Sequence, residues 1–373
     1  MKFFDINKDA ELLLESGILK KIKSFLKNGI YINGQENSQL ENQLKRFTGA
    51  KFCQLCSSGT DALMASLMCL GLKKGDEIIT SPYSWVSVAE VAKILGLKIK
   101  FADIDVNNFN ISLNSIRKVC SKKTKVIIPV SIFGMCPNLL EIKRFTKKNN
   151  FFLIEDAAQS FGASILKKNS CNIADISCTS FFPTKILGGY GDGGAIFTNN
   201  KNIHSKIKKI VNHGSLNKKN FDIIGMNARM DTIQSIFLLE KIKNIKGLIK
   251  KRIRISKVYN NFFNSNNITG LQKNNLQSHS VYAQYTILVR NRKKFINFLD
   301  KYKIPHMIYY KKPLYKNSAY YQNIFLKNTE FVSKHSVSLP MNLHDIKKTY
   351  YIIKKLEKIK NDKNIFFKTQ SLC

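Results

Sequence analysis

The sequence predicts an α/β protein, with a mostly parallel sheet in a large domain and a smaller α+β domain at the C-terminus. Short apolar runs alternate with helical patterns between about residues 50 and 200, which is typical of a parallel sheet with helices on both faces. The chain of 373 residues also exceeds the size at which a single core usually stops growing. A long helical pattern over 231–257 leads into a mixed remainder. We therefore predict a large domain over 1–249, which includes an N-terminal helical segment, and a small domain over 250–373.

The expected elements follow from apolar periodicity and from the turn residues that bound each run. Strands are expected over 52–56, 77–80, 98–104, 125–132, 151–156, 176–182, 195–199 and 282–290. Helices are expected over 61–72, 87–95, 139–148, 231–257, 292–302 and 345–359. The Asn- and Lys-rich stretches 215–221 and 260–278 should be loops, and the polar tail 361–373 should fray.

The formal net charge of +36 raises the question of a nucleic-acid partner. Only eight of the 61 basic residues are arginine, and the lysines are spread over most segments. Base readout and stacking favour clustered arginine with aromatic side chains, so we prefer a solvated basic surface and expect no nucleic-acid partner. No apolar run is long enough for a membrane span. Acidic residues stand where a signal peptide would be apolar, so we expect a cytoplasmic protein.

Eight cysteines in a chain of this length do not make a disulfide scaffold. Cys53 and Cys56 form a lone CxxC without a second pair of cysteines or a nearby pair of histidines. We favour buried cysteines on a strand over a zinc site, and no metal site is expected.

Three segments carry the parts needed to hold pyridoxal 5'-phosphate. Lys185 lies between Ser180 and a glycine run, and its amine can form an imine with the cofactor's aldehyde. Asp156 ends an apolar run, where its carboxylate can keep the pyridine nitrogen protonated. Ser58, Gly59 and Thr60 precede a helical pattern, and a helix N-terminus with hydroxyl groups suits a phosphate. Ligands of open α/β sheets bind at the carboxyl ends of the strands, where Asp156 is expected.

Each of these segments also has a simpler interpretation. Asp156 and the residues 58–60 could cap helices. Trp85, the single tryptophan, follows a strand and could stack on a planar cofactor or pack in the core. The glycines at 189, 191 and 194 match the dinucleotide fingerprint formally, but a strand rather than a helix is expected after them. We therefore reject the fingerprint and infer a glycine turn that lets the backbone approach closely near Lys185.

Taken together, these segments resemble the DegT/DnrJ/EryC1/StrS family of sugar-nucleotide aminotransferases, which have the fold-type-I architecture of enzymes that use pyridoxal phosphate. The matching motifs are SSGTDAL (57–63), IEDAAQSFGA (154–163), TSFFPTKILGGYGDGGAIFTN (179–199), NHG (212–214) and GMNARMDTIQ (225–234). The resemblance covers nearly the whole chain and keeps the order of the motifs. One branch of the family has His in place of the lysine and dehydrates sugars, and Lys185 argues against that branch.

The resemblance implies a role for each matching position. Lys185 would bond to the cofactor and then move protons, and Asp156 would pair with the pyridine nitrogen. The remaining cofactor contacts would come from Gln159 at the ring hydroxyl, from Trp85 stacked on the ring, from Ser58, Gly59, Thr60 and Ser180 at the phosphate, and from the partner subunit's Asn227. The resemblance thus implies a homodimer with shared active sites. It also implies that L-glutamate donates the amine that a nucleotide-linked keto-sugar receives.

The segments around Lys185 are most similar to members that act at C3 of UDP-linked 2-acetamido-3-keto-hexuronic acids, which points to surface polysaccharide precursors. Members that aminate C4 share most of the motifs and stay an alternative. Arg229 could anchor a substrate carboxylate, or could form a salt bridge at the subunit interface. Tyr309, Tyr310 and Tyr315 fall in the segment that lines the substrate, although His is common where Tyr315 stands. The residues 341–344 also depart from the family's usual sequence.

Two other classes of function stay open at this point. A regulatory or DNA-associated protein that keeps the same fold is suggested by the net charge. A nicotinamide oxidoreductase is supported by the glycine run alone.

Overall fold

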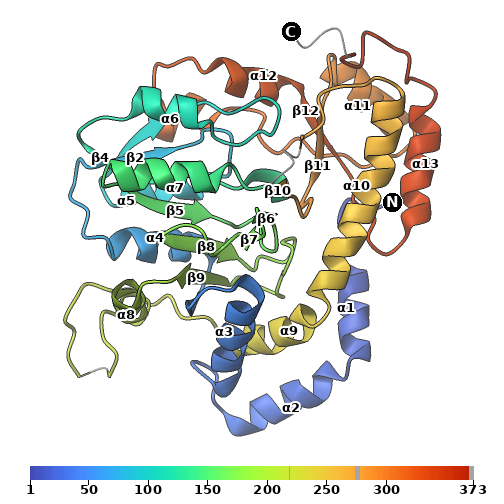
Figure 1. The fold of residues 1–373 in the computed structure, drawn as a ribbon. Helices are drawn as coiled ribbons and strands as arrows, with labels where there is room; N and C mark the ends of the chain where they lie inside the picture. The colour runs from blue at the N-terminus through green and yellow to red at the C-terminus, as the bar shows by residue number, and fades with distance from the viewer. Residues whose placement is uncertain (218, 274–277, 369–373) are drawn as a thin grey trace.

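The computed structural model describes residues 1–217, 219–273 and 278–368 (Figure 1). Its centre is a seven-stranded sheet in the order β1-β9-β8-β5-β4-β2-β3. The strands are β1 (Phe52–Cys56), β2 (Glu77–Thr80), β3 (Lys98–Phe101), β4 (Thr124–Ile128), β5 (Phe152–Asp156), β8 (Ile176–Ser180) and β9 (Gly194–Thr198). Only β9 runs against the others, because it pairs antiparallel with both β1 and β8. The prediction of a mostly parallel sheet is therefore confirmed.

Helices cover both faces of this sheet, because neighbouring residues of each strand enter different cores. Ile78 and Ile154 pack in one core with helices α4 (Gly59–Met68), α5 (Ser87–Ile94) and α8 (Lys201–Ile210). Ile79 and Leu153 pack in another with α6 (Leu113–Val119) and α7 (Leu139–Lys148). This burial on both faces explains why most of the strands are rich in apolar residues, although β3 also carries lysine and β8 serine and threonine.

The N-terminal helices are α1 (Ile6–Glu15), α2 (Ile18–Asn28) and α3 (Gln35–Thr48). Helix α3 packs on β1 and on α9 (Thr232–Ile242), and Lys21 of α2 binds Glu240 of α9 at 2.7 Å. Several large apolar side chains of this region stay exposed, including Leu19, Leu26 and Ile30.

The prediction of a single helix over 231–257 is wrong, because the chain forms two helices there. Helix α9 ends at Ile242, and α10 (Ile245–Ser265) begins after Asn244, which has non-helical dihedral angles. The break lets each helix bury its own apolar face, with Leu238 in the core beside β1 and Ile255 in the core of the C-terminal region. Helix α10 also shows that the loop predicted over 260–278 begins later than expected; part of that loop, 274–277, lies outside the described residues.

The C-terminal region holds the antiparallel pair β11 (Tyr285–Leu288) and β12 (Ser336–Leu339), with α11 (Arg292–Lys301) and α13 (Ile346–Leu356). Helix α12 (Lys327–His335) instead reaches the large sheet, since its Val332 packs in the same core as Ile78. A small three-stranded sheet joins β6 (Ser164–Ile165), β7 (Lys168–Asn169) and β10 (Ser278–His279).

The prediction of a frayed tail is wrong for its first part. Ile365, Phe366 and Phe367 are buried, and Phe366 packs against Phe263 and Phe295. Polar residues lie on both sides of this short apolar segment, so the average composition of the tail did not indicate that the segment is buried. The end of the predicted tail, 369–373, lies outside the described residues.

Cys53 and Cys56 are both buried on β1, but they belong to cores on opposite faces of the sheet. Two ligands that face opposite ways cannot bind one metal ion, so the interpretation as strand residues agrees with the structure. Across the described residues, no helix combines the length and the apolar character that crossing a bilayer requires.

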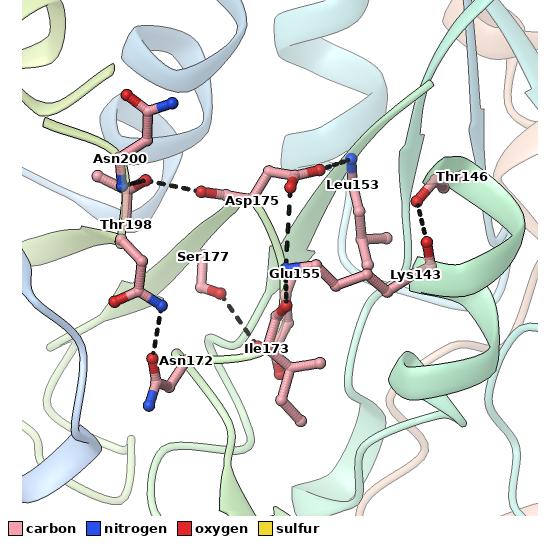
Figure 2. Close-up of polar contacts among 11 residues, drawn as sticks. Lys143, Thr146, Leu153, Glu155, Asn172, Ile173, Asp175, Ser177, Thr198 and Asn200 are labelled. Atoms are coloured by element: carbon pink, nitrogen blue, oxygen red, sulfur yellow. Dashed lines mark hydrogen bonds and ion pairs between the residues drawn. The ribbon is translucent and has the colours of Figure 1, made fainter. Parts of the chain in front are cut away.

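Polar side chains also join the strands of the large sheet at its centre (Figure 2). Asp175, just before β8, accepts a hydrogen bond from the Leu153 amide at 2.9 Å and lies 3.8 Å from the Lys143 amine of α7. Its carbonyl accepts a bond of 2.7 Å from the Thr198 hydroxyl of β9. These contacts fix β5, β8 and β9 relative to one another, and these strands carry Asp156 and flank Lys185.

Candidate active site

Lys185 lies in the turn that connects β8 with β9. Its amide donates to the Phe182 carbonyl at 2.8 Å, and the Gly189 amide donates to the Phe181 carbonyl at 2.6 Å. A side chain at Gly188 would collide with the Pro183 carbonyl, which explains why glycine stands there. The tight turn fixes Lys185 at the carboxyl end of β8, where the sequence predicted it.

Asp156 ends β5 and is buried, with 9% of its surface exposed. One of its oxygens accepts a hydrogen bond of 3.0 Å from the Ala158 amide. Burial raises the pKa of Asp156, and the positive charge of Lys185 opposes that rise. Burial likewise lowers the pKa of Lys185 against the opposing charge of Asp156. The two groups are therefore close enough to act on each other, although they come from segments 29 residues apart (185 − 156).

The segment predicted to bind a phosphate lies where β1 passes into α4. Ser58 caps this helix, and its hydroxyl accepts a bond of 3.0 Å from the Asp61 amide. The amides of Gly59 and Thr60 lie in the first turn, where no carbonyl of the helix can reach them. A Cβ atom at Gly59 would lie 2.8 Å from the Cβ atom of Ser180. The structure thus brings Ser180 of β8 directly against the helix N-terminus.

Thr60 also contacts a residue that sequence reasoning missed. Its hydroxyl lies 2.8 Å from the hydroxyl of Ser87, which begins α5. Trp85 precedes Ser87 and is 68% exposed, so the alternative that it packs in the core is wrong. The only sequence signal for Ser87 was its position after the carboxyl end of β2, where ligand-binding loops gather in such sheets.

Gln159 is buried and held from two sides. Its side-chain oxygen accepts a bond of 2.9 Å from the Phe133 amide, and its nitrogen donates to the Tyr310 hydroxyl at 3.0 Å. The ring of Tyr310 stacks on that of Phe133, with 6.0 Å between the ring centroids. This arrangement joins Tyr310, from the C-terminal region, to the loop that follows Asp156.

The other four residues predicted to bind a ligand lie in two segments, with Asn227 and Arg229 between α8 and α9, and Tyr309 and Tyr315 after α11. Asn227 is exposed, and Arg229 donates to the Asn212 side chain at 3.2 Å. Tyr309 is half-buried beside Tyr310. Tyr315 is 1% exposed, and its hydroxyl donates to Glu330 at 2.8 Å. In this structure Tyr315 therefore packs in the core, and its hydroxyl already has an acceptor.

A helix N-terminus, hydroxyl groups and a lysine beside a buried aspartate lie at the carboxyl end of a mostly parallel sheet. This combination defines a transferase of the pyridoxal phosphate type. The sequence model of the DegT/DnrJ/EryC1/StrS aminotransferase family matches residues 13–356. The chain belongs to this family, and it is a pyridoxal-phosphate-dependent aminotransferase.

Individual proteins are also similar to the chain over most of its length. The chain is 38% identical to UDP-2-acetamido-2-deoxy-3-oxo-D-glucuronate aminotransferase of Pseudomonas aeruginosa, over 86% of the chain and 88% of the relative. It is 30% identical to a pleiotropic regulatory protein of Geobacillus stearothermophilus, over 88% and 90%. The crystal structure of an aminotransferase of the same family from Brucella abortus superposes with a TM-score of 0.91 and 29% identity, over 97% of this chain and 100% of the other.

Proposed function

We propose that this aminotransferase moves the amino group of L-glutamate to C3 of a UDP-linked 2-acetamido-2-deoxy-3-keto-hexuronic acid. The observation that carries this proposal is the similarity to the Pseudomonas aeruginosa enzyme, whose name specifies such a substrate. The product is a precursor of a surface polysaccharide such as lipopolysaccharide O-antigen, made in the cytoplasm. A nucleotide sugar is an anion, and the net charge of +36 favours its approach.

The residues at the carboxyl end of the sheet fit pyridoxal phosphate. The amides of Gly59 and Thr60, with the Ser58 and Ser180 hydroxyls, would hold the phosphate, because these amides have no acceptor within α4. Trp85 is free to stack on the ring. Gln159 would contact the ring hydroxyl, and Asp156 would hold a proton on the ring nitrogen. When bound, the cofactor supplies an electron-withdrawing ring that stabilises negative charge at the reacting carbon.

Lys185 is the residue that moves protons during the exchange. Burial lowers its pKa, so its amine loses a proton more readily than an exposed lysine does. A neutral amine can take a proton from the α-carbon of the donor and later deliver one to C3 of the sugar. The tight turn around Lys185 limits the directions from which that proton arrives, so it also restricts the stereochemistry of the product.

We propose that the active form is a homodimer with shared sites. Trp85 and Asn227 are exposed, as residues at a shared site would be in a single subunit. Large apolar side chains are also exposed nearby in the chain, at Leu216, Phe221 and Ile224. A partner that covers them would remove apolar surface from water. In this arrangement Asn227 reaches the partner's cofactor, and Arg229 anchors a substrate carboxylate.

Two alternatives remain for the test to separate. One is amination at C4 by a member of the same family. The other is a regulatory protein that keeps the fold, which the name of the Geobacillus stearothermophilus relative suggests. Lys185 favours an enzyme, because a half-buried lysine whose pKa is lowered by burial, with an aspartate charge acting on it, is typical of catalytic sites.

The test incubates the purified holoprotein with L-glutamate and, separately, with a UDP-linked 3-keto-hexuronate, its neutral 3-keto counterpart and a nucleotide-linked 4-keto sugar. Mass spectrometry identifies the aminated product, and the Lys185→Ala variant is the control. We expect amination of the 3-keto-hexuronate and none by the variant. Amination of the 4-keto sugar alone would contradict the proposed substrate. No amination of any sugar, combined with salt-dependent DNA binding, would favour the regulatory protein.

A further inference from the structure

A cavity of 380 Å³ lies between the Lys185 turn and the C-terminal region. Lys185 itself is among the residues that line it, together with the N-terminal Phe3, the start of α10 and the loop over 341–345. This loop departs from the usual sequence of the family. The cavity thus joins the catalytic turn to parts of the chain for which the sequence suggested no role.

Arg252 of α10 lines this cavity and is 5% exposed. Its Nη1 atom donates to the carbonyls of Tyr282 and Ala283, at 3.1 and 3.0 Å. Its Nε atom is buried without a hydrogen-bond partner, and no carboxylate among the described residues forms an ion pair with it. Burial lowers the pKa of Arg252 to about 10, so the guanidinium stays charged at neutral pH.

The free side of Arg252 has the geometry that a carboxylate requires. Its two backbone bonds both use Nη1, which leaves the edge formed by Nε and Nη2. Two parallel N–H groups on one edge bind the two oxygens of a carboxylate together. A buried charge without a partner is costly, so a protein that keeps one has either a compensating ligand or a structural use for the charge.

A second donor without a partner lines the same cavity. The Nδ2 atom of Asn342 is buried and has no acceptor in the described part of the chain. Four acidic residues also line the cavity. Asp9 lies 3.0 Å from His344 and its charge acts on Arg252, Glu240 binds Lys21 and Lys243 at 2.7 and 2.8 Å, Asp345 accepts from the Lys347 amide at 3.0 Å, and Asp5 is the fourth. None of the four forms an ion pair or a hydrogen bond with Arg252 or Asn342 in the described part of the chain, so the two buried donors stay without an acceptor.

We propose that this cavity binds a carboxylate group of a ligand, with Arg252 and Asn342 as the donors. The inference rests on the proposed function, which offers two carboxylates: one on the amino donor L-glutamate and one on the hexuronic acid. Both present the same chemistry to Arg252. Lys185 and its neighbours over 183–187 form one wall of the cavity, so a ligand bound there would contact the turn that carries the proton-moving residue.

The test measures dissociation constants by calorimetry on the holoenzyme with three probes: glutarate, UDP-glucuronate and UDP-glucose. Glutarate stands for the donor, and the two nucleotide sugars differ in the carboxylate at C6. The main variant is Arg252→Met, and Arg252→Lys restores the charge. The matched control is Arg254→Met, because Arg254 lies on the same helix and is exposed. Asn342→Leu removes the second donor and leaves the Arg252 bonds to the backbone intact.

We expect Arg252→Met to weaken one carboxylate probe by about 10–100-fold, which is typical for the loss of hydrogen bonds from a charged group. Loss for glutarate assigns the site to the donor, and loss for UDP-glucuronate but not UDP-glucose assigns it to the sugar. Arg252→Lys should recover part of the affinity, and Arg254→Met should change nothing. If Arg252→Met does not fold, Asn342→Leu must weaken the same probe by itself.

The inference is overturned if both variants bind glutarate and UDP-glucuronate as the wild type does. It is also overturned if UDP-glucose binding falls equally, if Arg254→Met has the same effect, or if the wild type binds no carboxylate probe. If the enzyme aminates the sugar equally well without Arg252, this inference is wrong but the proposed function stands. If the carboxylate probe binds through Arg252 but no sugar is aminated, the proposed function is wrong and this inference stands.

Discussion

Glu155 and Asp156 are neighbours on β5, yet their side chains point to opposite faces of the sheet and have different surroundings. Glu155 is fully buried, and Figure 2 shows the Ser177 hydroxyl bound to its carboxylate. The other groups that donate to Glu155 are the hydroxyls of Ser131, Ser160 and Ser170 and the amide of Cys171, at 2.7–3.5 Å, and the thiol of Cys136, at 3.8 Å. The Asp156 carboxylate, in contrast, accepts one hydrogen bond from the described residues, from the Ala158 amide.

The difference shows that two buried carboxylates of one strand have different roles. A buried charge must be compensated, and Glu155 receives this compensation from the protein. Its donors come from β8 and from the segments that connect β4 with β8, and those segments also hold Phe133 and Gln159. Asp156 lacks such a set of donors and lies beside Lys185. We infer that Glu155 fixes the structure around the site, whereas Asp156 is left for the cofactor.

Of the substitutions that compare these two carboxylates, Asp156→Asn is expected to have the larger effect on activity. An amide cannot hold a proton on the ring nitrogen, so the electron-withdrawing effect of the cofactor is lost. We expect kcat for amination to fall roughly 100–1000-fold, the range for the loss of one electrostatic contact in an active site. Steady-state kinetics measures the change, with circular dichroism as the control for folding. Activity within threefold of the wild type would remove the distinction between the two carboxylates.

The opposite pattern is expected from Glu155→Gln, which should affect stability more than chemistry. The side-chain NH2 group of the glutamine would face hydrogen-bond donors. A hydroxyl donor can rotate to another acceptor, but the backbone N–H of Cys171 cannot. We expect the free energy of unfolding to fall by about 1–3 kcal/mol, the usual cost of an unsatisfied buried group. Urea titration of the apoprotein measures this change, and the exposed Glu15→Gln serves as the control. A loss of kcat without a loss of stability would assign Glu155 a chemical role instead.

A smaller effect is expected where a side chain serves the cofactor alone. Trp85 and Ile94 are 68% and 67% exposed, so Ala at either position should leave the stability of the apoprotein nearly unchanged. Only Trp85→Ala removes a ring that can stack on the cofactor. We expect it to raise the dissociation constant of pyridoxal phosphate about 3–10-fold, with no change for Ile94→Ala. Titration of the apoprotein with cofactor compares the two, and equal constants would show that Trp85 does not stack.

The smallest effect is a pH dependence of stability that belongs to Asp156. Its pKa is raised by burial, so the folded apoprotein holds a proton that the unfolded chain releases. As pH rises above the ordinary aspartate pKa, wild type should therefore lose stability relative to Asp156→Asn, by about 1 kcal/mol per unit of upward shift. Urea titrations of both proteins at several pH values from acid to neutral measure this difference. Parallel curves would mean that the folded protein does not raise this pKa.

The sequence predicted most of the large sheet, because most of its strands are rich in apolar residues and turn residues bound them. Strands 52–56 and 77–80 and helix 139–148 have the bounds that were predicted. Asp156, Lys185 and the residues around Gly59 were recognisable because each follows the carboxyl end of a strand or lies in a distinctive glycine or hydroxyl pattern. These signals are local, so a single sequence is sufficient to carry them.

Features that depend on distant contacts could not be predicted in this way. The break at Asn244 depends on two cores that lie in different regions of the molecule. Tyr315 has the residue type of a ligand contact, but only the fold places Glu330 against its hydroxyl. Arg252 lies in a helix rich in lysine and arginine, and nothing in the sequence separates it from the exposed Arg254. Its burial depends on the carbonyls of Tyr282 and Ala283, 30 and 31 residues away.

The most direct test of the account is the visible absorption spectrum of the purified protein before and after addition of L-glutamate. We expect a yellow band from cofactor bound to Lys185, which bleaches as the amine is transferred. The Lys185→Ala variant should lack both the band of the lysine-bound cofactor and rapid bleaching, while the secondary structure stays unchanged. A wild-type protein that remains colourless after incubation with pyridoxal phosphate would contradict the assignment of Lys185 and Asp156 as a working site.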